Sequence, residues 1–339
     1  MDTSRNRIAV SGVGGGVGQS VLKSLRDTDY EVIALDGEPL AVGLYAAKTS
    51  HIIPYATAPN YIEKLLEICK AEGCALLFPG LDAELPILSK AIDRFTAIGT
   101  QVVVSSPEVV AVADNKLLTY TKLSEYGVSV PMTVDMSQKN GTEEPVPYPF
   151  ILKIKEGGAR SQDVHVIKDQ ASWQSLIASN IDLRIFVAQQ YIEGDEYTCG
   201  SINLDGECKG VIVMRRILRD GDTYKCFSEK NPVIESEVRK IMAAIKPFGA
   251  CNVQLRLQDG KPYVFEINAR CSGTTAARAL CGFNEPEMIA DYLLSHKEPT
   301  YEIKEQTILR YWKELVVANE QVDTLKQAGT LRSNSVQKL

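Results

Sequence analysis

The sequence has no apolar run that approaches the roughly 18 residues of a membrane-spanning helix, so we expect no membrane partner. It also has no polybasic stretch and no acidic tail, because its net charge of -6 is spread along 339 residues. Without clustered Lys and Arg side chains there is no electrostatic basis for a nucleic-acid partner. A small ligand, and an anionic one in particular, is compatible with this charge balance.

The eight cysteines form no C-x-x-C pair, and most of them stand beside apolar residues. Neither a disulfide framework nor a zinc site is predicted, and we expect reduced thiols in a cytoplasmic protein. The first residues, MDTSRNRIAV, pass from a polar start directly into an apolar strand without a secretion signal. Histidine is scarce too: His51, His165 and His296 belong to no motif that carries chemistry, and we expect packing or surface roles for them.

What the sequence does contain is, first, an alternation of short apolar runs and helical periodicity in residues 1–112. The runs RIAVSG, EVIALD, CALLFPG and QVVVSS are predicted strands, and helices are predicted over 17–26, over 61–70 and up to residue 92. Apolar runs separated by such helices are typical of a parallel sheet covered on both faces. This segment is predicted to be a doubly wound α/β domain.

The rest of the chain predicts two further units and a tail. In 113–187, a helix capped by Asp114 precedes a proline-rich linker and two strands, FILKI and DVHVI, which the flap KEGGARSQ joins. This unit is predicted to be a small lid. In 188–318, strands alternate with Asp-Gly turn signals, which is typical of an antiparallel sheet. Residues 319–339 carry no motif.

The glycine-rich loop SGVGGGVGQS after the first predicted strand indicates one candidate site. Glycines there let the backbone approach an anion at a helix N-terminus, and Asp36 ends the second strand, where dinucleotide-binding folds keep a ribose-binding carboxylate. The register is not G-x-G-x-x-G, because Val17 occupies the place of the third glycine. A nicotinamide-dependent oxidoreductase is therefore one alternative, and a plain strand-to-helix turn is another.

The stretch VFEINAR indicates a second candidate site. Glu266 and Asn268 stand two apart on a predicted strand and therefore point to one face. A carboxylate and an amide oxygen side by side suit Mg²⁺, which fills its other positions with water and phosphate oxygens. Gln254, on the preceding strand, joins this face only if the hairpin loop has an odd number of residues. We predict such a loop at 258–260.

Other residues predict a polyphosphate near this face. Lys153 lies in an otherwise apolar strand, where an unpaired ammonium is costly unless it meets an anion. Lys116 opens a predicted helix. The flap after Lys153 contains Gly157, Gly158 and Ser161 and can bring backbone N–H groups to phosphate. Phosphate lysines, a closing flap and a magnesium face are together typical of an ATP site.

With these motifs the sequence resembles the ATP-grasp superfamily, and within it the synthetase component of carbamoyl-phosphate synthetase. The likeness extends to about residue 318 and is most specific in NVQLRLQDGKPYVFEINAR. It implies a doubly wound preATP-grasp domain followed by an ATP-grasp fold, with 113–187 as lid and 188–318 as an antiparallel α+β catalytic subdomain. Unlike the carbamoyl-phosphate enzyme, this chain has one copy of the unit and no glutaminase-like part.

The resemblance also implies roles for individual residues toward ATP and two Mg²⁺ ions, with Mn²⁺ as an alternative metal. Many ATP-grasp enzymes have a carboxylate at the position of Gln254, so the occupancy of the first metal position stays open. The implied sites are Gln189 and the backbone from Gln190 to Ile192 for adenine, Glu196 for ribose, Lys116, Lys153, Gly158 and Ser161 for phosphate, and Gln254, Glu266 and Asn268 for the two metals.

The implied function is an ATP-dependent carboxylate-amine ligase. ATP phosphorylates a small carboxylate substrate to an acyl phosphate, an amine attacks it, and ADP and phosphate are released. Arg270 and Lys153 would neutralise the charge that develops during transfer. A non-catalytic ATP-binding relative is a further alternative, which the joint retention of both lysines with Glu266 and Asn268 disfavours. The substrates and the oligomeric state, including a homodimer, are left open.

Overall fold

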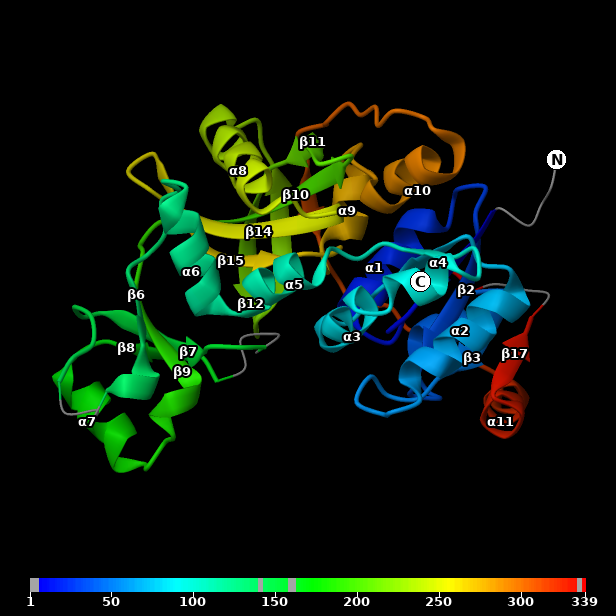
Figure 1. Ribbon diagram of the computed structural model, residues 1–339, viewed down its shortest axis with the longest axis horizontal. Coiled ribbons are helices and arrows are strands. Elements are labelled where there is room, and N and C mark those ends of the chain that lie inside the picture. The colour runs from blue at the N-terminus through cyan, green and yellow to red at the C-terminus, as the bar shows by residue number, and fades with distance from the viewer. Residues whose placement is uncertain (1–5, 140–142, 158–162, 334–336) are drawn as a thin grey trace.

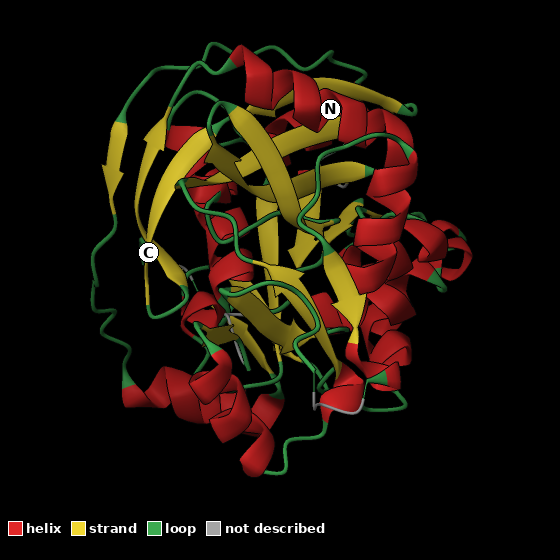
Figure 2. Cartoon of the chain, turned by 90° about the vertical axis from the view of Figure 1, so that its left-hand side faces the viewer, coloured by secondary structure: helices red, strands yellow, loops and turns green. Residues whose placement is uncertain are grey.

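The computed structural model describes residues 6–139, 143–157, 163–333 and 337–339. The chain forms three bodies, and Figure 1 shows them as an N-terminal α/β body on the right, a large sheet with its helices above, and a small sheet at the lower left. In Figure 2 the helices lie around the strands of these sheets. No helix in the described part of the chain is long and apolar enough to cross a bilayer.

The N-terminal body contains a parallel sheet, as the apolar runs predicted, and its strand order is β3-β2-β1-β4-β5. Buried aliphatic side chains form one apolar cluster on each face of this sheet, because the strands are covered by helices on both sides. The bounds are β1 Arg7–Val10, α1 Gly16–Leu25, β2 Glu31–Asp36, β3 Thr49–Ile52, α2 Tyr61–Glu72, β4 Leu76–Phe78, α3 Leu85–Ser89, α4 Ile92–Thr96, β5 Gln101–Val102 and α5 Pro107–Asp114.

The C-terminal segment 319–339 is not a separate tail, contrary to the prediction. It contains α11 (Asn319–Ala328) and β17 (Thr330–Arg332), and β17 pairs antiparallel with β3 at the edge of the N-terminal sheet (Figure 1). Leu325 and Leu331 are buried in the cluster of that sheet. Neither strand was predicted, because TSHI of β3 and TLR of β17 each contain a single apolar residue and show no strand periodicity.

The small sheet has the order β6-β9-β7-β8, and the predicted strand pair FILKI and DVHVI forms β7 and β8. Phe150, Trp173 and Phe186 fill its core together with aliphatic side chains. The aromatic rings make this a compact unit with a core of its own. The bounds are β6 Thr133–Asp135, β7 Phe150–Ile154, β8 His165–Ile167, α7 Gln170–Ala178 and β9 Phe186–Gln190.

Helix α6 (Lys116–Glu125) does not pack in the small sheet, although the predicted lid begins at residue 113. It packs against β15, and Leu123 is buried in the apolar cluster of the large sheet together with Val128. The predicted boundary is therefore displaced: packing assigns α6 to the large body, and the small sheet extends to the end of β9. The role of this unit as a lid stays a prediction.

The large sheet is antiparallel throughout, as the Asp-Gly signals predicted. Asp205, Asp220 and Asp259 each precede a glycine, and both residues of each turn have positive φ. Helices α9 and α10 pack against α1 and so join this body to the N-terminal one. The bounds are β10 Asp195–Leu204, β11 Glu207–Ile212, β12 Met214–Arg219, β13 Asp222–Ser228, α8 Pro232–Ile245, β14 Gly249–Gln258, β15 Lys261–Asn268, α9 Thr275–Leu280, α10 Glu285–Ser295 and β16 Thr307–Leu309.

Candidate active site

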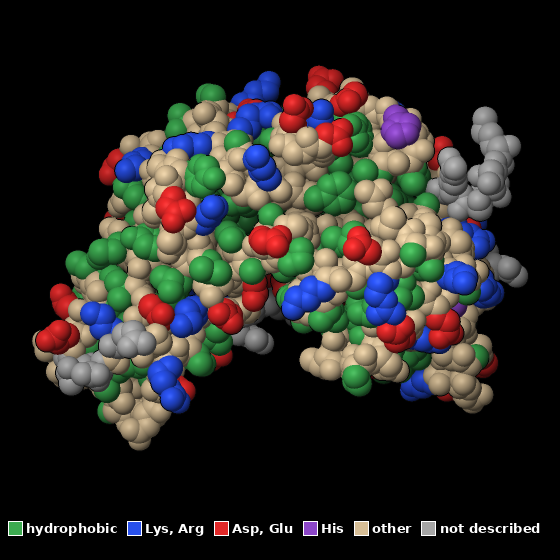
Figure 3. Space-filling model, viewed as in Figure 1, with side chains coloured by type: hydrophobic (Ala, Val, Ile, Leu, Met, Phe, Trp, Pro, Cys, Tyr) green, Lys and Arg blue, Asp and Glu red, His purple; other side chains and the backbone are tan. Residues whose placement is uncertain are grey.

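A cavity of about 560 Å³ lies where the three bodies meet. Strands β14 and β15 line it from the large sheet, the start of α1 and the loop after β4 line it from the N-terminal body, and Lys116 with Gly157 lines it near the small sheet. The space-filling view shows the molecule hollowed between the small body and the N-terminal body (Figure 3). Cavities between domains are preferred places for small-molecule sites.

The three side chains predicted to share one face, Gln254, Glu266 and Asn268, all line this cavity. The prediction that an odd-numbered hairpin loop brings them together is wrong. The hairpin turn has two residues, Asp259 and Gly260, because Gln258 pairs directly with Lys261. The register shifts instead within the strands: Gln254 pairs with Glu266, whereas Leu255 pairs with Val264. Phe265 is therefore the extra residue of a β-bulge, and such a bulge changes strand parity just as an odd loop would.

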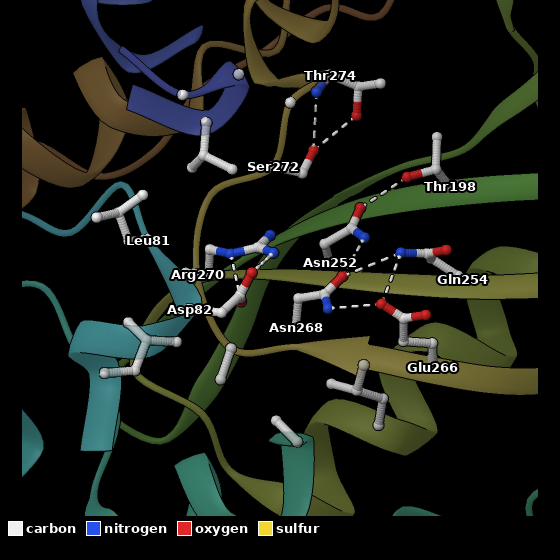
Figure 4. A pocket seen from close by; sticks show the side chains of 18 of the residues that line it. Leu81, Asp82, Thr198, Asn252, Gln254, Glu266, Asn268, Arg270, Ser272 and Thr274 are labelled. Atoms are coloured by element: carbon white, nitrogen blue, oxygen red, sulfur yellow. Dashed lines mark hydrogen bonds and ion pairs between the residues drawn. The ribbon is translucent and has the colours of Figure 1, made fainter. Parts of the chain in front are cut away.

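The polar side chains on this face form one hydrogen-bonded group (Figure 4). The Nδ2 atom of Asn268 donates to Oε1 of Glu266 at 2.9 Å, and Nε2 of Gln254 donates to the same oxygen at 3.2 Å. The Oδ1 atom of Asn268 accepts from Nε2 of Gln254 at 3.1 Å and from Nδ2 of Asn252 at 3.0 Å. Asn252 was not among the predicted residues, although its position two before Gln254 places it on the same face.

The donor set of this face fits a magnesium ion that is completed by phosphate oxygens. Within the described ranges there is no group of three or more His, Cys, Asp or Glu side chains that could hold a metal. A cation here would depend on the single carboxylate of Glu266, the amide oxygen of Asn268 and the ligand itself, which is the way Mg²⁺ is commonly held beside nucleotides. The Oε2 atom of Glu266 takes part in neither of the two bonds to the amides.

The two predicted phosphate lysines lie close to the start of the flap. Lys153 is buried on β7, and its ammonium donates to the carbonyl of Phe265, the bulge residue, at 3.2 Å. Burial lowers the pKa of Lys153 to about 8, and the nearby Glu266 carboxylate opposes this shift. Lys116 donates to the carbonyl of Gly157 at 2.5 Å. Gly158 and Ser161 lie outside the described residues.

Arg270 is held by an acidic residue from the other side of the cavity. Its Nε and Nη2 atoms donate to the two oxygens of Asp82 at 2.8 and 2.6 Å (Figure 4). This bidentate pair fixes the guanidinium of Arg270, whose side chain is only 9% exposed, across the interface of the two large bodies. The pairing of Asp82 with Arg270 could not be read from the sequence, because the two residues are 188 positions apart.

The residues predicted for adenine and ribose are not among those that line the cavity. Gln189 is buried in the small sheet and donates to Thr133 at 2.9 Å, and Gln190 bonds Met132 through both its backbone and its side chain. The carbonyl of Ile192 accepts from Arg256 at 3.2 Å. All of these contacts are within the protein, so the adenine-binding roles of these residues stay predictions.

Glu196, the predicted ribose carboxylate, lies between two arginines. Its Oε1 atom accepts from Nε and Nη2 of Arg216 at 3.0 and 2.7 Å, and its Oε2 atom accepts from Arg256 at 2.9 Å. Arg216 itself lines the cavity. Neither arginine was among the predicted site residues, because the sequence of a strand does not show which acidic residue an arginine on it will pair with.

The glycine loop uses its polar groups internally. Gly14 donates its backbone N–H to Asp36 at 2.7 Å, and the other oxygen of that carboxylate accepts from the backbone of Glu38 at 2.9 Å. A Cβ atom at Gly14 would lie 2.8 Å from that of Ala41, so glycine is needed there for packing. Asp36 thus stabilises the loop as a strand-to-helix turn, which was one of the two alternatives. These contacts do not support a dinucleotide site.

Two family models match parts of the chain. The PylC-like N-terminal domain matches residues 9–103, and the model described as ATP-grasp in the biosynthetic pathway with Ter operon matches residues 182–315. Among curated proteins, the carbamoyl phosphate synthase large chain of Mesorhizobium japonicum is 21% identical over 329 residues, covering 80% of this chain and 27% of that one. The Pseudothermotoga lettingae protein of the same name is 22% identical, covering 91% of this chain and 30% of that one. The chain thus spans less than a third of the length of these relatives.

Solved structures share the fold. The N5-carboxyaminoimidazole synthetase of Staphylococcus aureus, complexed with ADP, has a TM-score of 0.71 at 16% identity and covers 98% of this chain and 94% of its own. The L-amino acid ligase of Bacillus licheniformis has a TM-score of 0.68 at 17% identity and covers 86% of this chain and 74% of its own. Residues 182–315 thus match a model of the ATP-grasp class, and the chain shares its fold with the solved structures above. Within this class it is similar to the carbamoyl phosphate synthase large chain, and the resemblance found in the sequence is confirmed.

Proposed function

We propose that the protein is an ATP-dependent ligase that converts a carboxylate substrate to an acyl phosphate and joins it to an amine, with release of ADP and phosphate. The observation that carries the proposal is the convergence of Glu266, Asn268 and Arg270 on one cavity, with the ammonium of the buried Lys153 bonded to the carbonyl of Phe265 beside Glu266. A carboxylate and amide for a metal, an ammonium for phosphate and a fixed guanidinium are what phosphoryl transfer requires.

The residues divide the work of phosphoryl transfer by position. Lys116 and Lys153 bind the phosphates of ATP in the ground state. Glu266 and Asn268 hold Mg²⁺, which when bound offsets the negative charge of the polyphosphate. Arg270 is already oriented by Asp82, so it can meet the developing acyl phosphate without rearranging first. No covalent intermediate on the enzyme is needed.

The experiment that tests this function is a screen of amino acids and small carboxylic acids for ATP-dependent formation of a hydroxamate in the presence of hydroxylamine. An acyl phosphate is trapped as a hydroxamate, and the nucleotide product is ADP. We expect at least one carboxylate to give both products in equal amounts. Formation of AMP and pyrophosphate would contradict phosphoryl transfer to the carboxylate, and binding of a nicotinamide dinucleotide without ATP would favour the oxidoreductase alternative.

The lowered pKa of Lys153 predicts that nucleotide binding takes up protons near pH 8. In the free protein the ammonium is half deprotonated at its pKa of about 8, and a phosphate group beside it raises that pKa. Binding should therefore draw up to about half a proton at pH 8, and affinity should fall as the pH rises above this value. Calorimetry of an ATP analogue in buffers with different ionisation enthalpies measures this uptake.

Lys153→Met should abolish the proton uptake, whereas Lys168→Met, at an exposed lysine of the same small body, should leave it unchanged. Uptake that persists in Lys153→Met would show that another group titrates. An affinity that stays constant between pH 7 and 9 in the unmodified protein would contradict the contact between Lys153 and phosphate.

A further inference from the structure

The hydrogen-bonded face formed by Asn252, Gln254, Glu266 and Asn268 is called the metal face below. Two arginines determine which way its amide side chains point. A guanidinium can only donate hydrogen bonds, so an amide group beside it must present its oxygen. Nη2 of Arg278, which is fully buried, donates to Oδ1 of Asn252. Nη2 of Arg216 donates to Oε1 of Gln254 at 2.6 Å. The oxygens of Asn252 and Gln254 therefore face the arginines, and their NH₂ groups face the metal side.

Gln254 consequently offers the metal face a donor and no acceptor. Its Nε2 atom donates to Glu266 at 3.2 Å and to Asn268 at 3.1 Å, and neither partner can donate back through those oxygens. A divalent cation needs oxygen lone pairs and gains nothing from an NH₂ group. Turning the amide of Gln254 would place its NH₂ against the Arg216 guanidinium, where two donors would oppose each other.

Arg216 already places a positive charge at this end of the cavity. It lies on β12 directly opposite Glu196 on β10 and is only 11% exposed. Its guanidinium bridges the Glu196 carboxylate and the Gln254 oxygen, with all three bonds between 2.6 and 3.0 Å. The amide oxygen that a cation beside Gln254 would use is thus already bound to a fixed cation, and a second metal there would be repelled by the Arg216 guanidinium. The Asn268 oxygen differs, because it accepts only from the neutral amides of Gln254 and Asn252.

We propose that Arg216 supplies the positive charge of the first metal position, so that this protein binds ATP with one divalent cation, held by Glu266 and Asn268. This inference rests on the proposed function, because it assumes that the cavity binds ATP. It makes Arg216 a residue of the nucleotide site and replaces the two-metal arrangement that the sequence resemblance implied.

The test is equilibrium dialysis of the full chain with Mn²⁺ and a non-hydrolysable ATP analogue. Free metal and free metal–nucleotide complex are equal on both sides of the membrane, so the excess in the protein compartment gives the ratio of bound Mn²⁺ to bound nucleotide. We expect a ratio of one. A ratio of two would overturn the inference while leaving the proposed function intact. No excess of nucleotide would overturn the proposed function, and the inference with it.

Variants test whether Arg216 is the reason for the ratio. The pair Arg216→Met with Gln254→Glu removes the fixed cation and adds a carboxylate, and should raise the ratio to two. Arg215→Met is the matched control: Arg215 is the neighbouring residue on β12 and pairs with Glu229 at 2.7 Å, and this variant should keep a ratio of one. A ratio of one in the folded double variant would overturn the role assigned to Arg216. The measurement on the unmodified protein stands whether or not the double variant folds.

Discussion

Glu266→Gln should lower hydroxamate formation by at least about 100-fold. Loss of a residue that only supports a metal ligand commonly lowers metal affinity or activity by about 10- to 100-fold, and Glu266 is itself a proposed ligand. Glu266 is the single carboxylate in the hydrogen-bonded group with Gln254 and Asn268. An amide in its place removes the negative charge and leaves the NH₂ groups of two neighbours without an ionised acceptor. The affinity for Mn²⁺ in the presence of an ATP analogue should fall in parallel.

Glu207→Gln is the control for this substitution, because Glu207 is an exposed glutamate on β11 that pairs with Lys209 at the surface. It should retain full activity and metal affinity. Were Glu266→Gln to keep metal affinity and lose only rate, Glu266 would act on the substrate and the assignment of the metal face would be wrong. Circular dichroism of both variants checks that the fold is intact.

Arg278→Met should reduce the free energy of unfolding by about 3 to 5 kcal/mol, because it leaves a charge buried without its partner. Arg278 and Glu285 are both 0% exposed, and Nη1 of the arginine donates to the carboxylate at 2.8 Å. The same carboxylate accepts from Thr275 at 2.8 Å. A Cβ atom at Gly200 would overlap both charged groups, so the strand beside them needs glycine there. Urea unfolding measures the loss.

The exposed pair of Arg94 and Glu63 provides the comparison, and Arg94→Met should cost far less stability than Arg278→Met. The double substitution Arg278→Met with Glu285→Leu removes both charges and should recover part of the stability. Equal losses for Arg278→Met and Arg94→Met would contradict the stabilising role of the buried pair. Because Arg278 also orients Asn252, its loss should loosen the metal face as well.

The sequence alone was sufficient for the order of the bodies and for the identity of several cavity residues. Continuous apolar runs predicted the parallel sheet because strands covered on both faces have no polar side to show. The Asp-Gly pairs predicted the turns of the large sheet because few other residues adopt positive φ at low cost. The two-residue spacing of Glu266 and Asn268 placed them together because side chains alternate along a strand.

Local signals failed where a partner lies far along the chain. The bulge at Phe265 results from pairing between two strands, and nothing in the composition of the hairpin distinguishes it from an odd loop. The pairing of β17 with β3 joins segments almost 280 residues apart in sequence, and neither has the apolar alternation that would announce a strand.

Sequence therefore determined which groups this protein carries in the proposed phosphate and metal site, since residue type and short spacing fix local geometry. Tertiary structure decided how those groups are used. Arg216 on β12 meets Gln254 on β14 over the intervening strand β10. Asp82 meets Arg270 across two bodies, and Asp36 bonds its own glycine loop. The charge state, orientation and free acceptors of a site depend on such long-range partners, because a donor or a charge acts on whatever packing places beside it.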